Sequence, residues 1–306
     1  MREFRVLILT NSASDLSKLV FPDFEILNTN SDEFKDFVTN TKVPEYSFMY
    51  SIAEYFEMDG KQRYAILNKD LSKPFGAKKI HRIYEFLLLL CPSNLAVEHI
   101  VHFKFDKNEL IHRDSFNAEI YDEEDESFFK FNNSDLEKIN MFIDTYYKEF
   151  QSISYLNSTI QNYLNALDNP HYYHFSFIAL CISLESITNG NTELLYRIRR
   201  NVAVICGKDI ESSQIIFDNI NTIYKLRSKI VHGSDFSDDQ VYDYLYYLKC
   251  IVSKLIIELL IHKIPKLELL NKNITTLGFG DRAKISENWT NIQLNEDVEN
   301  IIYNKI

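Results

Sequence analysis

Glycine and proline are scarce in this chain, which has seven Gly and six Pro among its 306 residues. Collagen-like and low-complexity chains depend on these two residues, so both classes are excluded. Cysteine is scarce as well, and the four residues are too widely spaced to form the C-x-x-C pair of a zinc ribbon. Each lies among apolar residues, and we expect reduced core thiols at Cys91, Cys181, Cys206 and Cys250.

Long hydrophobic runs are also lacking. The longest, residues 251–264, is interrupted by two lysines, a glutamate and a histidine, so we expect no membrane-spanning segment. Near the N-terminus the only apolar run is Val6–Leu9, which is too short for a secretion signal. We therefore expect a cytoplasmic protein that does not associate with membranes.

Positive charge is in deficit, with 33 Lys and Arg against 44 Asp and Glu and a net charge of −11. This balance argues against a general DNA-coating protein and against a polybasic membrane binder. The deficit is uneven, because residues 191–232 hold seven basic side chains against four acidic ones. This basic stretch could therefore bind an anionic ligand.

The first 130 residues have the pattern of a β-rich domain. Val, Ile, Phe and Tyr are frequent, and several segments alternate apolar and polar residues. One helix, Ala77–Leu90, is expected before Pro92, and strands are expected at 5–10, 24–27, 46–58, 64–67, 95–105 and 109–121. The acidic run 122–126 is interpreted as a solvated linker, with mimicry of nucleic acid as the alternative. We place a domain boundary near residue 130.

Residues 131–264 have helical periodicity throughout. Capping boxes are predicted at Ser134–Glu137 and Ser237–Gln240, and helices at about 134–150, 153–167, 172–187, 193–205, 213–231 and 237–264. The helix at 172–187 is apolar nearly all round, so we expect it to be central. The fold class is therefore α+β: a β-rich domain (1–130) that could sense or regulate, an all-α bundle (131–264), and a C-terminal extension (265–306) wrapping the surface.

The helix 213–231 carries the candidate catalytic residues. Its buried stripe is expected at Ile216, Ile220 and Ile223. The next position on that stripe is Arg227, and an inward guanidinium is costly unless an anion satisfies it. His232 ends the helix just before Gly233, where free carbonyls favour an imidazolium. An arginine that holds an oxyanion and a histidine that transfers protons near neutral pH suit attack on a phosphodiester.

Two segments carry a resemblance to a known family. Residues Tyr224–Gly233 read YKLRSKIVHG, and residues Leu184–Ala203 read LESITNGNTELLYRIRRNVA. Both resemble the HEPN superfamily, and the second resembles its Apea-like branch, over residues 134–264. The resemblance implies a bundle that forms a homodimer, with R-x4-6-H motifs from both copies facing each other.

In active members of the family these motifs form an endoribonuclease site that needs no metal or other cofactor. The resemblance implies that His232 is the general base or acid and that Arg227 holds the phosphate oxygens. It also implies an antiphage defence effector in bacteria, with a phage or host protein as trigger. The substrate would be RNA and not DNA, because the attacking group is the ribose 2′-OH.

A second interpretation is a catalytically silent HEPN module that dimerises and binds RNA or a protein. Ser228 follows the motif arginine, where active members usually carry Asn, Asp or His, although a serine hydroxyl can still donate a hydrogen bond. In the silent alternative Arg227 pairs with Glu185 and His232 caps the helix. We expect Glu185 to be buried and to bind Arg227 or Arg197 as a supporting residue of the site, with a direct catalytic role as the alternative.

Five basic residues are candidates for binding RNA phosphates: Arg197, Arg199, Arg200, Lys225 and Lys229. For the three arginines the alternative is an ordinary solvated helix face. His171 and His174 have a spacing that metal sites use, but no third ligand is visible. We therefore expect no metal site.

Overall fold

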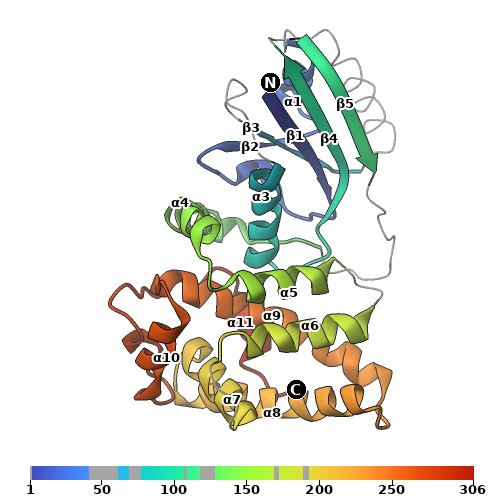
Figure 1. Cartoon of the computed structure of the whole chain (residues 1–306). Helices are drawn as coiled ribbons and strands as arrows, with labels where there is room; N and C mark the ends of the chain where they lie inside the picture. Colours follow the sequence, from blue (N-terminus) through green and yellow to red (C-terminus); the bar gives the residue numbers. More distant parts are fainter. Residues whose placement is uncertain are drawn as a thin grey trace. The chain divides into compact units, whose positions relative to one another are not determined.

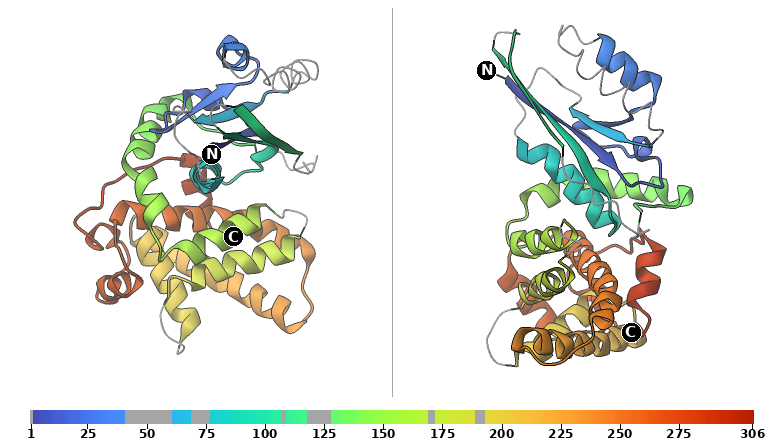
Figure 2. Two further views of the ribbon diagram at one scale, coloured as in Figure 1. Left: turned by 45° about the horizontal axis from the view of Figure 1, so that its top comes forward. Right: turned by 90° about the vertical axis from the view of Figure 1, so that its right-hand side faces the viewer.

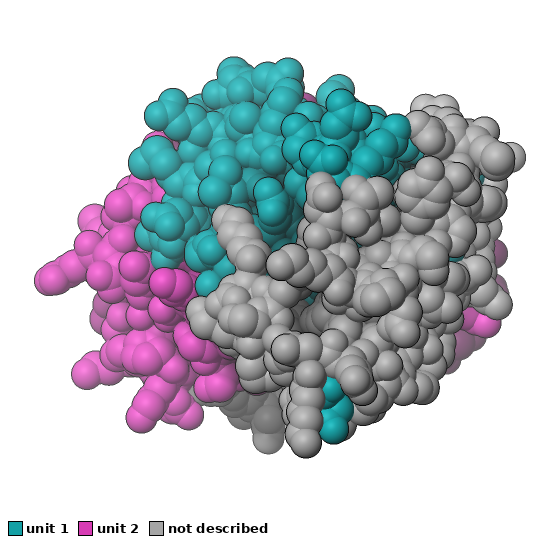
Figure 3. All heavy atoms as spheres, turned by 90° about the horizontal axis from the view of Figure 1, so that it is seen from above, with its two compact units in different colours: residues 1–88, 93–145 teal, residues 89–92, 146–306 magenta. Residues whose placement is uncertain are grey.

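All described strands lie before residue 118, and the chain after them is helical, in the computed structural model (Figure 1). The structure describes residues 2–40, 61–68, 77–106, 109–117, 128–168, 172–188 and 193–306. The predicted α+β class is confirmed. The chain forms two compact units, one of residues Met1–Leu88 and Ser93–Thr145 and one of Leu89–Pro92 and Tyr146–Ile306 (Figure 3). This division falls inside helix α4 (Leu136–Ser152), whereas the sequence places a domain boundary near residue 130.

An antiparallel sheet forms the framework of the first unit. Its order is β2-β3-β1-β4-β5, with β1 (Arg2–Thr10) in the middle. The other strands are β2 (Phe24–Asn28), β3 (Tyr64–Asn68), β4 (Ala96–Asp106) and β5 (Glu109–Asn117). In β1, four consecutive residues, Val6–Leu9, are at most 1% exposed, so both faces of the central strand are covered. The predicted strands in this region are confirmed, while the segment predicted at 46–58 and the acidic run 122–126 lie outside the described residues.

Helices complete the first unit. The helix α3 (Ala77–Leu90) has the predicted bounds, and its Phe86 ring stacks on Phe142 of α4 with the ring centroids 5.8 Å apart. A 3-10 turn η1 (Leu16–Lys18) and the helix α1 (Asp32–Asn40) were not predicted. The start of α1 is set by Ser31, whose hydroxyl accepts a hydrogen bond from the Phe34 N–H at 3.2 Å.

The second unit is helical. Its elements after α4 are α5 (Asn157–Leu167), α6 (Tyr173–Glu185), α7 (Leu194–Cys206), α8 (Ile210–His232), α9 (Asp238–His262), α10 (Leu267–Thr275), η3 (Arg282–Lys284) and α11 (Glu296–Ile302). The neighbours α5 and α6 both pack on α9, as do α7 and α11 (Figures 1 and 2). From Cys250 to His262 every residue of α9 is buried. The central helix is therefore α9, and the prediction that 172–187 is central is wrong, because α6 leaves Phe175 and Ile182 at the surface.

Helix ends show where local signals act. Asp209 and Ser212 form a reciprocal capping box that starts α8, with the Ser212 N–H donating to the Asp209 carboxylate at 2.8 Å. The helix therefore begins three residues before its predicted start at 213. Both predicted boxes are wrong: Ser237 precedes α9 but makes no side-chain cap bond, and Ser134 lies inside the 3-10 turn η2 (Asn133–Asp135). A left-handed Gly233, with φ of 67°, ends α8 as expected.

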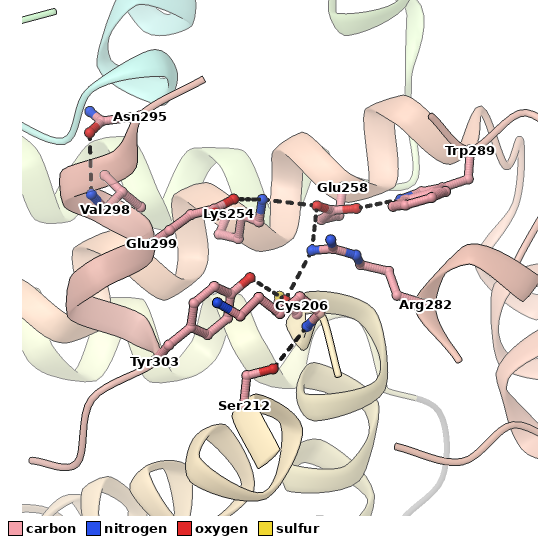
Figure 4. Close-up of polar contacts among 11 residues, drawn as sticks. Cys206, Ser212, Lys254, Glu258, Arg282, Trp289, Asn295, Val298, Glu299 and Tyr303 are labelled. Carbon is pink, nitrogen blue, oxygen red and sulfur yellow. Dashed lines mark hydrogen bonds and ion pairs between the residues drawn. The ribbon is translucent and has the colours of Figure 1, made fainter. Parts of the chain in front are cut away.

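A buried ion network joins the C-terminal segment to α9 (Figure 4). The carboxylate of Glu258 accepts hydrogen bonds or ion-pair contacts from Lys254 and Arg282, each at 3.0 Å, and from the Trp289 indole N–H at 3.0 Å. Lys254 also contacts Glu299 of α11 at 2.7 Å. Burial alone would lower the pKa of Lys254, but these two carboxylates raise it above its ordinary value. Residues 265–306 thus place charged side chains in the interior instead of only wrapping the surface.

No helix in the described parts of the chain is both long enough and apolar enough to cross a membrane.

Candidate functional site

The helix α8 leaves the core over its last two turns. Its predicted stripe is confirmed, since Ile216, Ile220 and Ile223 are completely buried. Arg227 continues the stripe with 30% of its side chain exposed, and the residues around it, Ser228, Lys229 and His232, are exposed. The motif arginine therefore lies where the packed interior meets the surface.

Glu185 and Arg227 form the ion pair that the sequence predicts. Glu185 is the last residue of α6, and its Oε1 lies 3.4 Å from Arg227 Nη2. The Tyr224 hydroxyl donates to the Cys181 carbonyl at 3.1 Å and holds α8 against α6 beside this pair. The Glu185 carboxylate is less buried than predicted: Glu185 ends its helix near the surface, and 23% of its side chain is exposed.

The pair uses only part of the arginine's bonding capacity. A guanidinium has five N–H donors, and a single contact at 3.4 Å engages one edge of it. The Arg227 Nε is buried and has no hydrogen-bond partner in the described parts of the chain. Burial, reinforced by the Glu185 charge, raises the pKa of the neighbouring Cys181 thiol, so this thiol stays neutral. Arg227 therefore makes one long ion-pair contact, and a further anionic oxygen would have to reach the exposed part of its guanidinium, because the buried Nε is closed to solvent.

His232 is the exposed last residue of α8. The Ser234 N–H donates to the Lys229 carbonyl at 3.0 Å, which turns the chain away directly after the imidazole. No side chain of the described residues hydrogen-bonds to that ring. Five residues of helix separate His232 from Arg227 by about 140° of rotation and about 7.5 Å of rise. The two side chains therefore do not share one helix face within a single copy.

Two of the predicted RNA-binding arginines hold the fold together. Arg199 Nε donates to the Phe217 carbonyl at 3.0 Å, and its guanidinium lies 3.8 Å from the centroid of the Phe217 ring. Arg200 Nη2 donates to three carbonyls at the end of α10, those of Ile274, Thr275 and Leu277, at 3.0, 3.1 and 2.6 Å. The basic surface near the motif is thus narrower than expected.

The remaining three candidates, Arg197, Lys225 and Lys229, are exposed. Arg197 belongs to α7, and the two lysines lie on α8 two residues before and two residues after Arg227, which places them on the helix face of His232 rather than on that of Arg227. They are the side chains through which a phosphate backbone could meet this end of the unit.

One further polar contact, between the starts of α6 and α9, was missed at the sequence level. His174 Nε2 lies 3.0 Å from an Asp238 carboxylate oxygen, and its ring packs edge-on against Phe236 at 5.3 Å between centroids. His174 thus pairs with an aspartate at the start of α9 rather than with His171, which lies outside the described residues. No cluster of three His, Cys, Asp or Glu side chains suited to a metal occurs among the described residues.

Comparisons of the chain with protein-family models, with curated proteins and with solved structures found no match. The HEPN resemblance therefore rests on the residues of α6, α7 and α8 quoted above.

Proposed function

We propose that the helical unit is a metal-independent endoribonuclease of the HEPN type. The observation that carries the proposal is that the end of α8 presents two groups, an Arg227 guanidinium that is 30% exposed and an exposed His232 imidazole. A phosphodiester brings the anionic oxygens that such a guanidinium lacks. The imidazole supplies a group that can take up and release a proton near neutral pH.

In the proposed reaction the ribose 2′-oxygen attacks the adjacent phosphorus and the bond to the 5′-oxygen breaks. A histidine takes the proton from the 2′-OH, and a histidine in the acid form protonates the leaving 5′-oxygen. Arg227 stabilises the negative charge that builds up on the non-bridging oxygens. The products carry a 2′,3′-cyclic phosphate and a 5′-OH, and DNA is not cut because it has no 2′-OH.

A two-fold homodimer completes this proposal. On α6, Phe175 and Ile182 are 56% and 38% exposed, and their spacing of seven places them on one helix face. Glu185 follows Ile182 by three residues, so this apolar stripe leads to the ion pair. A second copy packed on the stripe would bury it and bring two Arg227 and two His232 side chains together. In this arrangement one His232 would act as the base and the other as the acid. The Arg227 of one copy could also work with the His232 of the other, although the two side chains lie on different helix faces within one copy.

The proposed setting is a cytoplasmic antiphage effector of bacteria that responds to a phage or host protein. Arg197, Lys225 and Lys229 would hold the RNA backbone, and Ser228 would donate a hydrogen bond beside the arginine. Family resemblance alone supports the defence role. A specific observation favours the second candidate, the silent module for dimerisation and RNA or protein binding: Glu185 already provides Arg227 with an anion.

RNA cleavage by the purified full-length protein in EDTA separates the two candidates. We expect cleavage by the wild type, a loss of about 10²–10³ in rate for Arg227→Ala, and poor rescue by Arg227→Lys, which cannot grip two oxygens. His232→Ala should cost about 10²–10⁴. His174→Ala is the matched control, a histidine of the same unit outside the motif, and should stay within about threefold of the wild type.

The chemical nature of the RNA fragment ends gives a second readout. Fragments that end in a cyclic phosphate cannot be ligated until that end is repaired. Cleavage that disappears in EDTA, or that survives His232→Ala, refutes the ribonuclease proposal. RNA binding without cleavage in a gel shift would then support the silent module.

A further inference from the structure

A groove runs along the free edge of the sheet in the first unit. It has a volume of about 330 Å³ and is lined by five consecutive residues of β2, Phe24–Asn28, together with residues before and after the strand. Alternate residues of a strand face opposite sides of a sheet, so a groove that touches five in a row follows the edge of the strand. In the order β2-β3-β1-β4-β5, β2 is the terminal strand of the described sheet (Figure 1).

The strand register shows which backbone groups point into the groove. The Thr29 N–H donates to the Arg63 carbonyl at 3.0 Å, so Thr29 and every second residue before it bond to β3. Ile26 and Asn28 alternate with these residues along the strand, so their N–H groups point away from β3. Neither N–H has a partner among the described residues. The Ile26 carbonyl also faces outward, while the Asn28 carbonyl accepts from the Ser31 N–H at 3.0 Å.

The walls of the groove differ in chemistry. Leu19 and Val20 form an apolar wall, and Val20 is 58% exposed although it lies next to the buried Leu19. This wall is fixed by Asn140 of α4, which accepts from the Val20 N–H at 2.9 Å and donates to the Lys18 carbonyl at 3.1 Å. The exposed carboxylates of Glu25 and Glu33 also line the groove.

We propose that this groove binds an extended basic peptide segment of a partner protein by strand addition to β2. The outward backbone groups of Ile26 and Asn28 would bond to the peptide backbone, as in other sheet-edge complexes. Alternate apolar side chains would lie toward Val20, and the intervening Lys or Arg side chains toward Glu25 and Glu33. A second copy of this chain is a poor occupant, because it would bring the same carboxylates to the same edge. The proposal does not depend on whether the helical unit cleaves RNA.

The length of β2 sets the size of the probe. Five residues at about 3.3 Å each span about 17 Å, so a hexapeptide covers the edge. The test uses a fluorescent hexapeptide of alternating lysine and valine against the full chain, with alternating glutamate and valine as the comparison. We expect saturable binding of the lysine peptide only, weakened by at least about tenfold in Glu25→Lys/Glu33→Lys. Asp106→Lys/Asp144→Lys, an equal double reversal at exposed sites of the same unit away from the groove, should change binding by less than about twofold.

Backbone pairing is tested separately on the wild-type protein, so the outcome does not depend on how a variant folds. The peptide should slow hydrogen exchange at the amides of Ile26 and Asn28. N-methylation of alternate peptide residues should abolish binding in one register and leave it nearly unchanged in the other. Absence of saturable binding, or binding that neither the charge reversal nor N-methylation affects, overturns the proposal. Protection of the same two amides in concentrated protein without peptide would also overturn it, because a second copy would then occupy the edge.

Discussion

Glu258→Gln should destabilise the helical unit far more than its small change in shape suggests. The carboxylate is 1% exposed and receives Lys254, Arg282 and the Trp289 indole N–H, all at 3.0 Å. A glutamine at this position has one acceptor oxygen, and its amide NH2 would point at a donor. Lys254 would keep only Glu299, and Arg282 would lose its carboxylate contact.

The magnitude follows from the burial of these groups. Removing one partner of a buried ion pair leaves an uncompensated charge and costs about 3–5 kcal/mol. For a unit of this size, 1 kcal/mol shifts the melting temperature by about 2–4 °C. We therefore expect a fall of roughly 6–20 °C in the melting temperature of this unit. The loss would be a large part of a typical stability of about 5–15 kcal/mol.

Circular dichroism during thermal and urea unfolding provides the assay, with Glu185→Gln as the matched control. The control makes the same substitution in the same unit, but its ion pair with Arg227 is half-exposed at 3.4 Å and should be worth about 1 kcal/mol or less. Hydrogen exchange should also quicken in α10 and α11 of the Glu258→Gln protein. Equal costs for the two variants would refute the argument that the network holds the C-terminal segment in place.

Two further predictions concern pH and assembly. Burial lowers the pKa of His262 to about 4; the Arg282 charge acts in the same direction and the Glu258 charge opposes it. The ring bonds to Ser286 through Nδ1, and its buried Nε2 has no partner among the described residues. The unfolded chain takes up the proton first as the pH falls below about 6.5, so urea unfolding at about pH 5 should show about 2 kcal/mol less stability from this group than at about pH 7. His262→Gln should remove that part of the pH dependence, and an unchanged slope would contradict the assignment. Ile182→Glu should convert the proposed dimer to a monomer in sedimentation experiments at tens of micromolar (roughly). Met141→Glu, a control at a residue of the first unit that is 64% exposed, should leave the dimer intact. A wild-type protein that sediments as a monomer would count against the dimer.

The secondary structure of the described regions follows from short-range patterns. The strands at 24–28 and 64–68 and the helix 77–90 have nearly their predicted bounds, because short runs of aromatic and aliphatic residues and the helix-stopping Pro92 act locally. The helix α1 has Phe34, Phe37 and Val38 at helical spacing, so a signal was present in the sequence but extends over only nine residues. The start of α8 is not evident from the sequence, because Asp209 caps with Ser212 at the third helical position, where the usual capping box has glutamate or glutamine.

Some features of the candidate site could be predicted from the sequence, and others could not. Pairing of Arg227 with Glu185 could be predicted, because each is a charge on a helix of apolar residues and each therefore needs the other. The roles of Arg199 and Arg200 could not, because most of their partners are main-chain carbonyls, that of Phe217 within α8 and those of Ile274, Thr275 and Leu277 at the end of α10. A main-chain carbonyl has no side-chain signature, so only the folded chain shows that these cations are already used.

The central helix α9 carries a signal of a different kind. Lys254, Glu258 and His262 interrupt its apolar run at intervals of four, which places them on one face of the helix. In a helix buried on all sides, such a stripe requires a neighbour that brings opposite charges and hydrogen-bonding groups. Residues 265–306 meet that requirement with Arg282, Glu299 and Ser286, and the two cations then balance the two carboxylates. The same three residues that argue against a membrane span thus indicate that the weakly patterned end of the chain is an integral part of the fold.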